Sequence, residues 1–296
     1  MKPTNRCSQA FTLVELLVII AVLSLLGTFL LPAFAQSEKS QTIAVRCLEN
    51  HAQLIKAWQM YAVDSEDFVV NNYTIPGIQS AISKWKASGV SDTWAPNLMT
   101  FTVGSGSDSM STTNTALAQS GLLVPYHRNI EDYRCPTDHF LSKAQKTGGW
   151  NARLRSVSMN SNWGRSDPAE PKSGIDSSWT YGSAFRQWHR LAEVRKPADR
   201  YVFVDEHADS INDGFFILSW GSGTGEYPPT SASGTWGDIP GFYHHNATPF
   251  GFADGHTEMK KWVSRPIPVR ADGTYTTGPV NLLDQQWYVQ HVAERR

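Results

Sequence analysis

The sequence predicts an α+β protein in which one long N-terminal helix packs on a β-rich head with loop insertions. The first observation is an apolar stretch, residues 16–31, that contains no charged residue. The second is an apolar stripe at three- and four-residue steps that continues to about residue 63 and indicates one amphipathic helix. The third is a change after residue 133 to short apolar runs bounded by turn residues, which is typical of strands.

The apolar stretch is long enough to cross a membrane. About 20 apolar residues in a helix span a hydrocarbon core of about 30 Å, so residues 11–35 form the predicted transmembrane segment. Lys2 and Arg6 precede this segment, and no comparable basic cluster follows it directly. The N-terminus is therefore expected in the cytoplasm and the head outside. Glu15 lies just inside the segment, where an unpaired carboxylate is costly, so it needs a partner.

The start of the chain carries a recognisable signal. A short basic leader, residues 1–10, ends at the small residue Ala10, and Phe11-Thr12-Leu13-Val14-Glu15 opens the apolar helix. This pattern resembles the class III signal of type IV prepilins and type II secretion pseudopilins. The resemblance implies that prepilin peptidase cleaves between Ala10 and Phe11 and methylates the new amino group of Phe11. One departure is Ala10, where the family normally has glycine.

The same resemblance implies how the subunit is placed and assembled. Glu15 is expected to pair with the amino terminus of a neighbouring subunit, and Pro32 lies where the family has its helix-bending proline. The anchor then crosses the inner membrane once, and the head is periplasmic or part of a periplasmic or surface filament. The implied partners are prepilin peptidase, other pilin or pseudopilin subunits, and the inner-membrane assembly platform.

Two other interpretations of the N-terminus stay open. A conventional secretory signal has a basic start and a small-x-small exit, which Ala33-Phe34-Ala35 supplies. The apolar core of such a signal usually has about 7–15 residues, which residues 16–31 already exceed, and Glu15 is then unexplained. The second alternative is a plain N-terminal anchor that is not processed.

Four regions are expected along the chain. They are the leader at residues 1–10, the transmembrane segment at 11–35, a continuation of the helix at 36–64 and the extracytoplasmic head at 65–296. Within the head, residues 88–120 are rich in Ser, Thr, Gly and Asn and predict a long surface loop. The predicted strands are residues 155–160, 201–205 and 215–220, followed by a hairpin that turns at Asp254-Gly255 and a closing helix at 281–292.

Composition excludes some partners and suggests a disulfide. The 26 basic and 27 acidic residues give a net charge of −1, which provides no electrostatic basis for nucleic-acid binding. If the leader is removed, Cys7 leaves with it, and Cys47 and Cys135 remain as an even pair in an oxidising compartment. A disulfide between these two cysteines is expected, and two buried free thiols are the alternative.

The C-terminal part carries a second resemblance. His244, nine intervening residues and then Asp254-Gly255, within residues 241–262, are similar to the H-x9-DG domain found on many prepilin-like proteins. This resemblance implies a pilin-like long helix with a β-rich head. Four other stretches agree with the same domain: Cys47-Leu48-Glu49-Asn50, Tyr133-Arg134-Cys135-Pro136, Ser156-Val157-Ser158-Met159-Asn160 and Val204-Asp205-Glu206.

The densest set of possible metal ligands lies in the same part of the chain. A divalent-ion site is one hypothesis for this set, because carboxylates and imidazoles are common metal ligands. The structural alternative is that His244 hydrogen-bonds the Asp254-Gly255 turn. The candidate ligands are Asp205, Glu206, His244, Asp254 and His256.

No catalytic residues are predicted. The sequence has no two-histidine helix motif, glycine-rich phosphate loop or nucleophile elbow, so we expect neither an enzyme nor an organic cofactor. The expected function is that of a structural subunit of a type II secretion or type IV pilus-like apparatus. An anchored glycan-binding protein that uses exposed tryptophans is the main alternative, and an anchored hydrolase that uses the carboxylate and histidine cluster is a third.

Overall fold

The computed structural model describes residues 13–102, 111–170, 177–178, 182–217, 235–274 and 277–296. It divides into two compact units, Met1–Ile43 and Ala44–Arg296. The predicted leader and the cleavage and methylation positions, Ala10 and Phe11, lie outside the described residues. So does the end of the predicted strand at 215–220.

The first element, α1, is an α-helix that extends from Leu13 to Asp64. Its helical assignment continues through Pro32, where the bend stays a prediction. Among the described residues, none of the helices combines the length and the apolar character that a membrane span needs. The transmembrane segment at residues 11–35 therefore also stays a prediction.

The part of α1 in the second unit is helical because one of its faces is buried. Cys47, Leu54 and Trp58 are at most 1% exposed and recur at helical spacing, which places them on a single apolar stripe. The helix ends in a turn in which the amide of Asp67 donates to the carbonyl of Ala62 over 2.8 Å. This stripe confirms the apolar periodicity that the sequence showed between residues 44 and 61.

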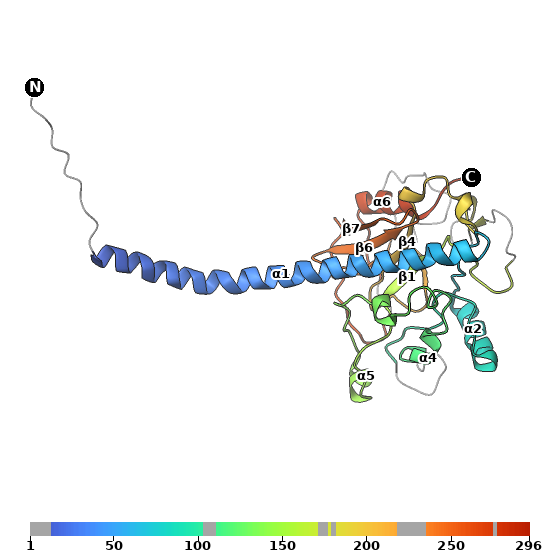
Figure 1. The fold of residues 1–296 in the computed structure, drawn as a ribbon, viewed down its shortest axis with the longest axis horizontal. Coiled ribbons are helices and arrows are strands. Elements are labelled where there is room, and N and C mark those ends of the chain that lie inside the picture. The colour runs from blue at the N-terminus through green and yellow to red at the C-terminus, as the bar shows by residue number, and fades with distance from the viewer. Residues whose placement is uncertain (1–12, 103–110, 171–176, 179–181, 218–234, 275–276) are drawn as a thin grey trace, which may run out of the picture. The chain divides into compact units, whose positions relative to one another are not determined.

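A five-stranded sheet forms the centre of the second unit, in the order β5-β1-β4-β6-β7. Figure 1 labels its strands β1, β4, β6 and β7. Every neighbouring pair is antiparallel except β1 and β5, which are parallel. The mixed α+β class is thus confirmed, as are the predicted strands in β1 and β4 and the hairpin between β6 and β7. The strands are β1 (Val157–Asn160), β4 (Tyr201–Asp205), β5 (Phe215–Phe216), β6 (Ala247–Phe252) and β7 (Thr257–Lys261).

The two faces of the sheet are covered by different helices. On one face, Leu54, Ile55 and Trp58 of α1 pack with Val202 and Phe203 of β4. On the other face, the closing helix α6 (Leu282–Val292) packs through Tyr288 and Val292 on Tyr201 and Val204 of the same strand. An irregular register between Tyr201 and Phe203 explains why two consecutive residues, 202 and 203, contribute to the same core.

The remaining elements lie outside the five-stranded sheet. The helix α2 (Ile75–Ser88) was not predicted; it builds a separate small core with Tyr73, Leu98 and Leu117. It ends at Gly89, whose φ of 74° allows the left-handed cap. The others are α4 (Thr115–Ala118), α5 (Lys143–Thr147), β2 (Ser177–Ser178), β3 (Gly182–Arg186) and the 3-10 turns η1 (Ile130–Tyr133), η2 (Leu191–Glu193) and η3 (Pro197–Asp199).

Candidate functional site

The N-terminal candidate is Glu15, in the first turn of α1. It is exposed within a run of exposed apolar residues that extends from Leu13 to Val22. A carboxylate in the first turn also interacts favourably with the positive end of the helix dipole. Glu15 is therefore the single acidic residue in an otherwise apolar helical surface.

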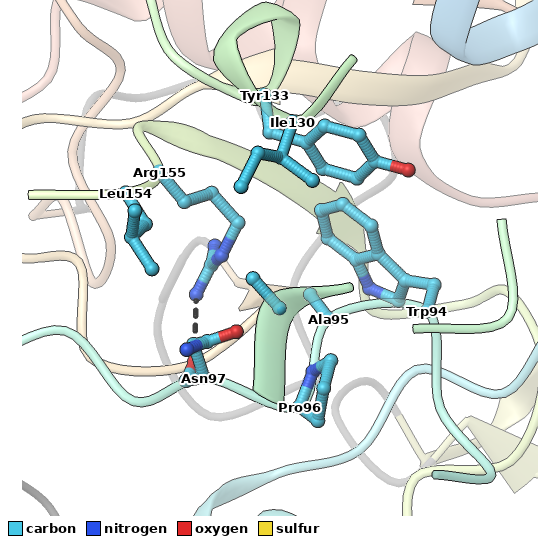
Figure 2. A pocket seen from close by; sticks show the side chains of 9 residues that line it. Trp94, Ala95, Pro96, Asn97, Ile130, Tyr133, Leu154 and Arg155 are labelled. Atoms are coloured by element: carbon cyan, nitrogen blue, oxygen red, sulfur yellow. Dashed lines mark hydrogen bonds between the residues drawn. The ribbon is translucent and has the colours of Figure 1, made fainter. Parts of the chain in front are cut away.

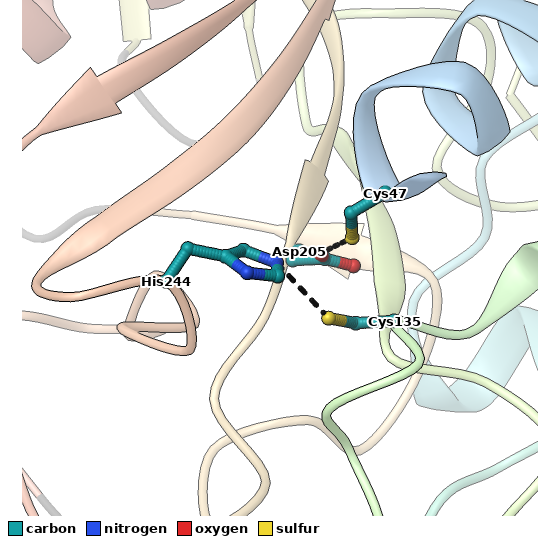
Figure 3. A group of neighbouring side chains, drawn as sticks. All are labelled: Cys47, Cys135, Asp205 and His244. Atoms are coloured by element: carbon teal, nitrogen blue, oxygen red, sulfur yellow. Dashed lines mark hydrogen bonds between the residues drawn. The ribbon is translucent and has the colours of Figure 1, made fainter. Parts of the chain in front are cut away.

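The second candidate is a cluster in the head formed by Cys47, Cys135, Asp205 and His244, which we call the buried thiol cluster (Figure 3). Cys47 comes from α1, Cys135 from the segment after η1, Asp205 from the last position of β4, and His244 from the turn before β6. One ligand atom from each residue lies within 4.8 Å of the other three. Four segments that are distant in sequence thus converge on one point.

Direct contacts connect the members of the cluster in pairs. The thiol of Cys47 donates to Oδ2 of Asp205 over 2.9 Å. Sγ of Cys135 lies 3.3 Å from Nε2 of His244. Ser156 supports both pairs, because its hydroxyl donates to Oδ1 of Asp205 over 3.1 Å and accepts the amide of Cys135 over 2.7 Å. The cluster is therefore held by hydrogen bonds as well as by packing.

Burial sets the protonation states in the cluster. It raises the pKa of the Cys47 and Cys135 thiols and lowers the pKa of His244, so these three groups are neutral near pH 7. Burial also acts to raise the pKa of Asp205, but the His51 ring, the Cys47 thiol and His244 outweigh it and hold that pKa below its usual value. The cluster thus contains one buried carboxylate among neutral donors.

His51 lies beside the cluster on α1, one helical turn after Cys47. It is fully buried, and neither of its ring nitrogens has a hydrogen-bond partner among the described residues. Its Nε2 is 3.7 Å from Oδ1 of Asp205, which is too far for a hydrogen bond. His51 is therefore packed in the core with its ring facing a carboxylate.

The expected disulfide is absent from the structure. Cys47 and Cys135 are both free and buried, although their sulfurs lie within 4.8 Å of each other. Each sulfur has a polar neighbour of its own, Asp205 for Cys47 and His244 for Cys135. The structure thus shows the alternative, two buried free thiols, and the disulfide stays a prediction.

Only two of the five predicted metal ligands meet. Asp205 and His244 are in the cluster, whereas the carboxylate of Glu206 accepts the hydroxyls of Ser158 and Ser210 over 2.5 and 2.9 Å. The other two, Asp254 and His256, pair with each other over 2.6 Å at the turn between β6 and β7. The two cysteines could not be recognised as metal ligands from their spacing. Cys135 follows Cys47 by 88 residues, and Asp205 follows Cys135 by 70.

The predicted hydrogen bond from His244 to the Asp254-Gly255 turn is wrong. The nine residues between them include all of β6, so the histidine and the turn lie at opposite ends of a strand. The His244 ring faces Cys135, and the turn is closed by Asp254, which accepts the amide of His256 over 3.1 Å. Gly255 has a φ of 106°, which glycine adopts without strain.

A pocket beside Arg155 is too small for a sugar or a cofactor (Figure 2). Its volume is about 20 Å³, and the indole of Trp94 and the ring of Tyr133 form one wall. A cavity of this size accommodates about one water molecule. The Arg155 guanidinium points into the pocket and donates to the carbonyl of Asn97 over 3.3 Å. The pocket is therefore part of the packing of the head.

The comparisons identify the N-terminal segment. The profile of the prokaryotic N-terminal methylation motif matches residues 5–31. This motif indicates a type IV pilin- or pseudopilin-like precursor, and it implies processing by prepilin peptidase and assembly with other pilin subunits in general. No curated protein and no solved structure matches the chain.

Proposed function

We propose that the chain is a structural subunit of a type II secretion or type IV pilus-like apparatus and that it is not an enzyme. The observation that carries this proposal is the methylation motif at residues 5–31. Prepilin peptidase would cut between Ala10 and Phe11, and the inner-membrane assembly platform would add the mature chain to its neighbours. The anchor would cross the inner membrane once, with the head in the periplasm.

The surface of the first helical turns supports assembly. Eight of the large apolar side chains that are at least 42% exposed lie between Leu13 and Val22. An exposed apolar surface of this kind is stable only when lipid or other helices cover it. Glu15 interrupts this surface, and the methylated amine of Phe11 on an adjacent subunit is the positive group that would pair with it. The pair would fix the register of neighbouring helices.

We also propose that the head is an H-x9-DG domain. His244 and Asp254-Gly255 support this assignment, since each has a distinct structural role. The histidine contributes to the buried thiol cluster, and Gly255 adopts a positive φ in the hairpin turn. The two halves of the motif thus stabilise opposite ends of β6.

The described tryptophans give no support to the glycan-binding alternative. It depended on exposed tryptophans, and Trp85 and Trp94 are two that the sequence places at the start of the predicted surface loop. Of the nine tryptophans that the structure describes, six are buried and three are half-buried. Trp94 is 1% exposed and belongs to the main core, and Trp85, a residue of α2, packs on the small core. Most of these indoles therefore stabilise the head by packing in its interior.

The mature N-terminus tests the proposed function. The full-length chain is expressed with prepilin peptidase, and its N-terminal peptide is identified by mass spectrometry. We expect N-methyl-phenylalanine from Phe11. Ala10→Arg should abolish this product because the enzyme needs a small residue there, and Ala35→Arg, which blocks a conventional exit, should leave it unchanged. A mature terminus at Gln36 would show ordinary secretion, and one at Met1 a plain anchor; either result would refute the proposal.

A further inference from the structure

The buried thiol cluster has the ligand set of a zinc site, and we propose that Cys47, Cys135, Asp205 and His244 bind one zinc ion in the head. Structural zinc sites in proteins are four-coordinate and tetrahedral, with ligands drawn from thiolate sulfur, imidazole nitrogen and carboxylate oxygen. The cluster offers two sulfurs, one nitrogen and one oxygen. Ions that prefer oxygen ligands, such as Mg²⁺ and Ca²⁺, do not suit this set, because its two sulfurs are soft ligands.

The distances fit an ion without rearrangement of the backbone. Zinc bonds of about 2.0–2.3 Å place the four ligand atoms about 3.3–3.8 Å from one another in a tetrahedron. The atoms of the cluster all lie within 4.8 Å of each other, and the Cys47–Asp205 and Cys135–His244 pairs are already at 2.9 and 3.3 Å. Small side-chain rotations are therefore enough to place all four atoms at bonding distance from a central ion.

The burial of Asp205 is a second observation that favours a cation at this point. Asp205 is fully buried, and a buried carboxylate is costly unless a positive charge or several hydrogen bonds compensate it. Its described neighbours are the Cys47 thiol, the Ser156 hydroxyl and two imidazoles. A divalent ion would bond this carboxylate directly and, with both cysteines bound as thiolates, would leave the net charge of the site at −1. Binding would release the two thiol protons to solvent, because thiolates are the ligands.

The groups around the cluster would orient the ligands. Ser156 holds Oδ1 of Asp205, which leaves Oδ2 directed at the other ligands. His244 begins a tight turn in which its amide and carbonyl both pair with Ala247, over 3.3 and 3.1 Å. The next two residues, His245 and Asn246, have positive φ values of 52° and 65°, as a two-residue hairpin turn requires. Such supports are typical of metal sites.

The site would stabilise the head rather than catalyse a reaction. All four ligands are at most 7% exposed, so no open coordination position faces solvent. The ion would join α1 to the end of β4, the segment after η1 and the turn before β6. A disulfide between Cys47 and Cys135 would use the same two sulfurs, so a disulfide and a zinc ion exclude each other. Whether the two sulfurs are oxidised to a disulfide or bound to zinc therefore distinguishes the disulfide prediction from the zinc proposal.

The test uses the full-length chain with Cys7→Ser, which leaves Cys47 and Cys135 as the remaining thiols. The chain is purified in detergent, reduced, stripped of metal with a chelator, and titrated with Zn²⁺ and Co²⁺. We expect one equivalent of zinc per chain by elemental analysis and, with cobalt, the visible absorption of a tetrahedral thiolate complex. Ser156→Ala, which removes only a supporting hydroxyl, should weaken zinc affinity about 10–100-fold.

Matched variants separate this site from others. Cys135→Ser should abolish the cobalt absorption, and His256→Asn, in the exposed pair at the β6–β7 turn, should leave it unchanged. The cobalt spectrum of the chain with all four ligands present reports metal binding directly. The test therefore does not depend on whether a ligand variant folds. A folded, reduced chain that binds no metal would overturn the proposal. Zinc binding that is unchanged in Cys135→Ser would also overturn it. The same holds if the chain is isolated with the Cys47–Cys135 disulfide and binds no zinc after reduction.

Discussion

Ile55 of α1 occupies the space that a side chain at position 251 of β6 would need. A Cβ atom placed on Gly251 would lie 2.6 Å from Cγ1 of Ile55 and 3.1 Å from its Cδ1. Real Cβ atoms essentially never approach another heavy atom to less than 3.0 Å. Glycine at this position therefore lets α1 lie directly on the sheet, and Ile55, at 1% exposure, fills the interface.

Gly251→Ala should lower the free energy of unfolding by about 1–3 kcal/mol, because overpacking a filled interface displaces side chains or backbone. Urea denaturation of the full-length chain in detergent, followed by tryptophan fluorescence, measures the change. Gly148→Ala is a suitable control, since the nearest atom to a Cβ there is 3.4 Å away. In combination with Ile55→Ala, the cost of Gly251→Ala should largely disappear. Strictly additive effects would contradict the proposed contact.

The helix–sheet interface shows what the sequence could predict. The apolar stripe of α1 and the strand at 201–205 are local patterns, and both were recognised from residue spacing alone. The Asp254-Gly255 hairpin was also predictable, because the residues of a tight turn are adjacent in sequence and their types favour the turn conformation. The strand that contacts α1 could not be predicted from the sequence. Nothing in the residues next to Gly251 indicates that Ile55 packs on it.

The buried thiol cluster was harder to predict for the same reason. Asp205 and His244 stood out because carboxylates and histidines are frequent ligands, but so did Glu206 and His256, which point elsewhere. What brings Cys47 to Asp205 is the packing of a helix on a strand 158 residues later. Contacts at such separations follow from the tertiary fold and not from any sequence motif.

The pH dependence of stability provides a second prediction, centred on Asp213. Its carboxylate is buried and accepts the amide of Phe215 over 2.8 Å, and burial raises its pKa to about 7. Arg155 lies nearby and donates to the carbonyl of Asp213, while the buried carboxyls of Glu206 and Asp238 face the same region. Since an unfolded Asp has a pKa of about 3.9, the folded state keeps a proton that the unfolded state releases.

The contribution of Asp213 to stability is therefore complete below about pH 4 and is lost as the pH rises to about 7. Asp213→Asn keeps an acceptor for Phe215 but cannot ionise. The variant should gain stability relative to the parent by up to about 1.4 kcal/mol per pH unit across this window. Urea midpoints at several pH values measure the gain, with the exposed Asp199→Asn as control. If stability depends on pH in the same way in the parent and in Asp213→Asn, the raised pKa of Asp213 is ruled out.

Asp284 gives a third prediction, for the docking of α6. Its buried carboxylate accepts the amides of Val263 and Ser264, over 2.9 and 2.6 Å, and lies 3.6 Å from Nζ of Lys260. Asp284→Ala leaves two amides without their acceptor and should cost about 2–4 kcal/mol, with faster hydrogen exchange in α6. Gln290→Ala, on the exposed side of the same helix, should have little effect. Unchanged exchange in Asp284→Ala would show that α6 is held by its apolar contacts alone.

The last prediction concerns Glu15, which we expect to be needed for assembly and not for the folding of the head. A carboxylate in lipid either takes up a proton or costs several kcal/mol, whereas the amine of Phe11 on a neighbouring subunit provides a positive partner. Glu15→Val should therefore leave membrane insertion and the thermal stability of the head unchanged but abolish incorporation into filaments. Co-expression with the assembly machinery, shearing and blotting measure this. Glu49→Val, at an exposed position of α1, should enter filaments normally. Parent-level incorporation of Glu15→Val would favour the plain anchor.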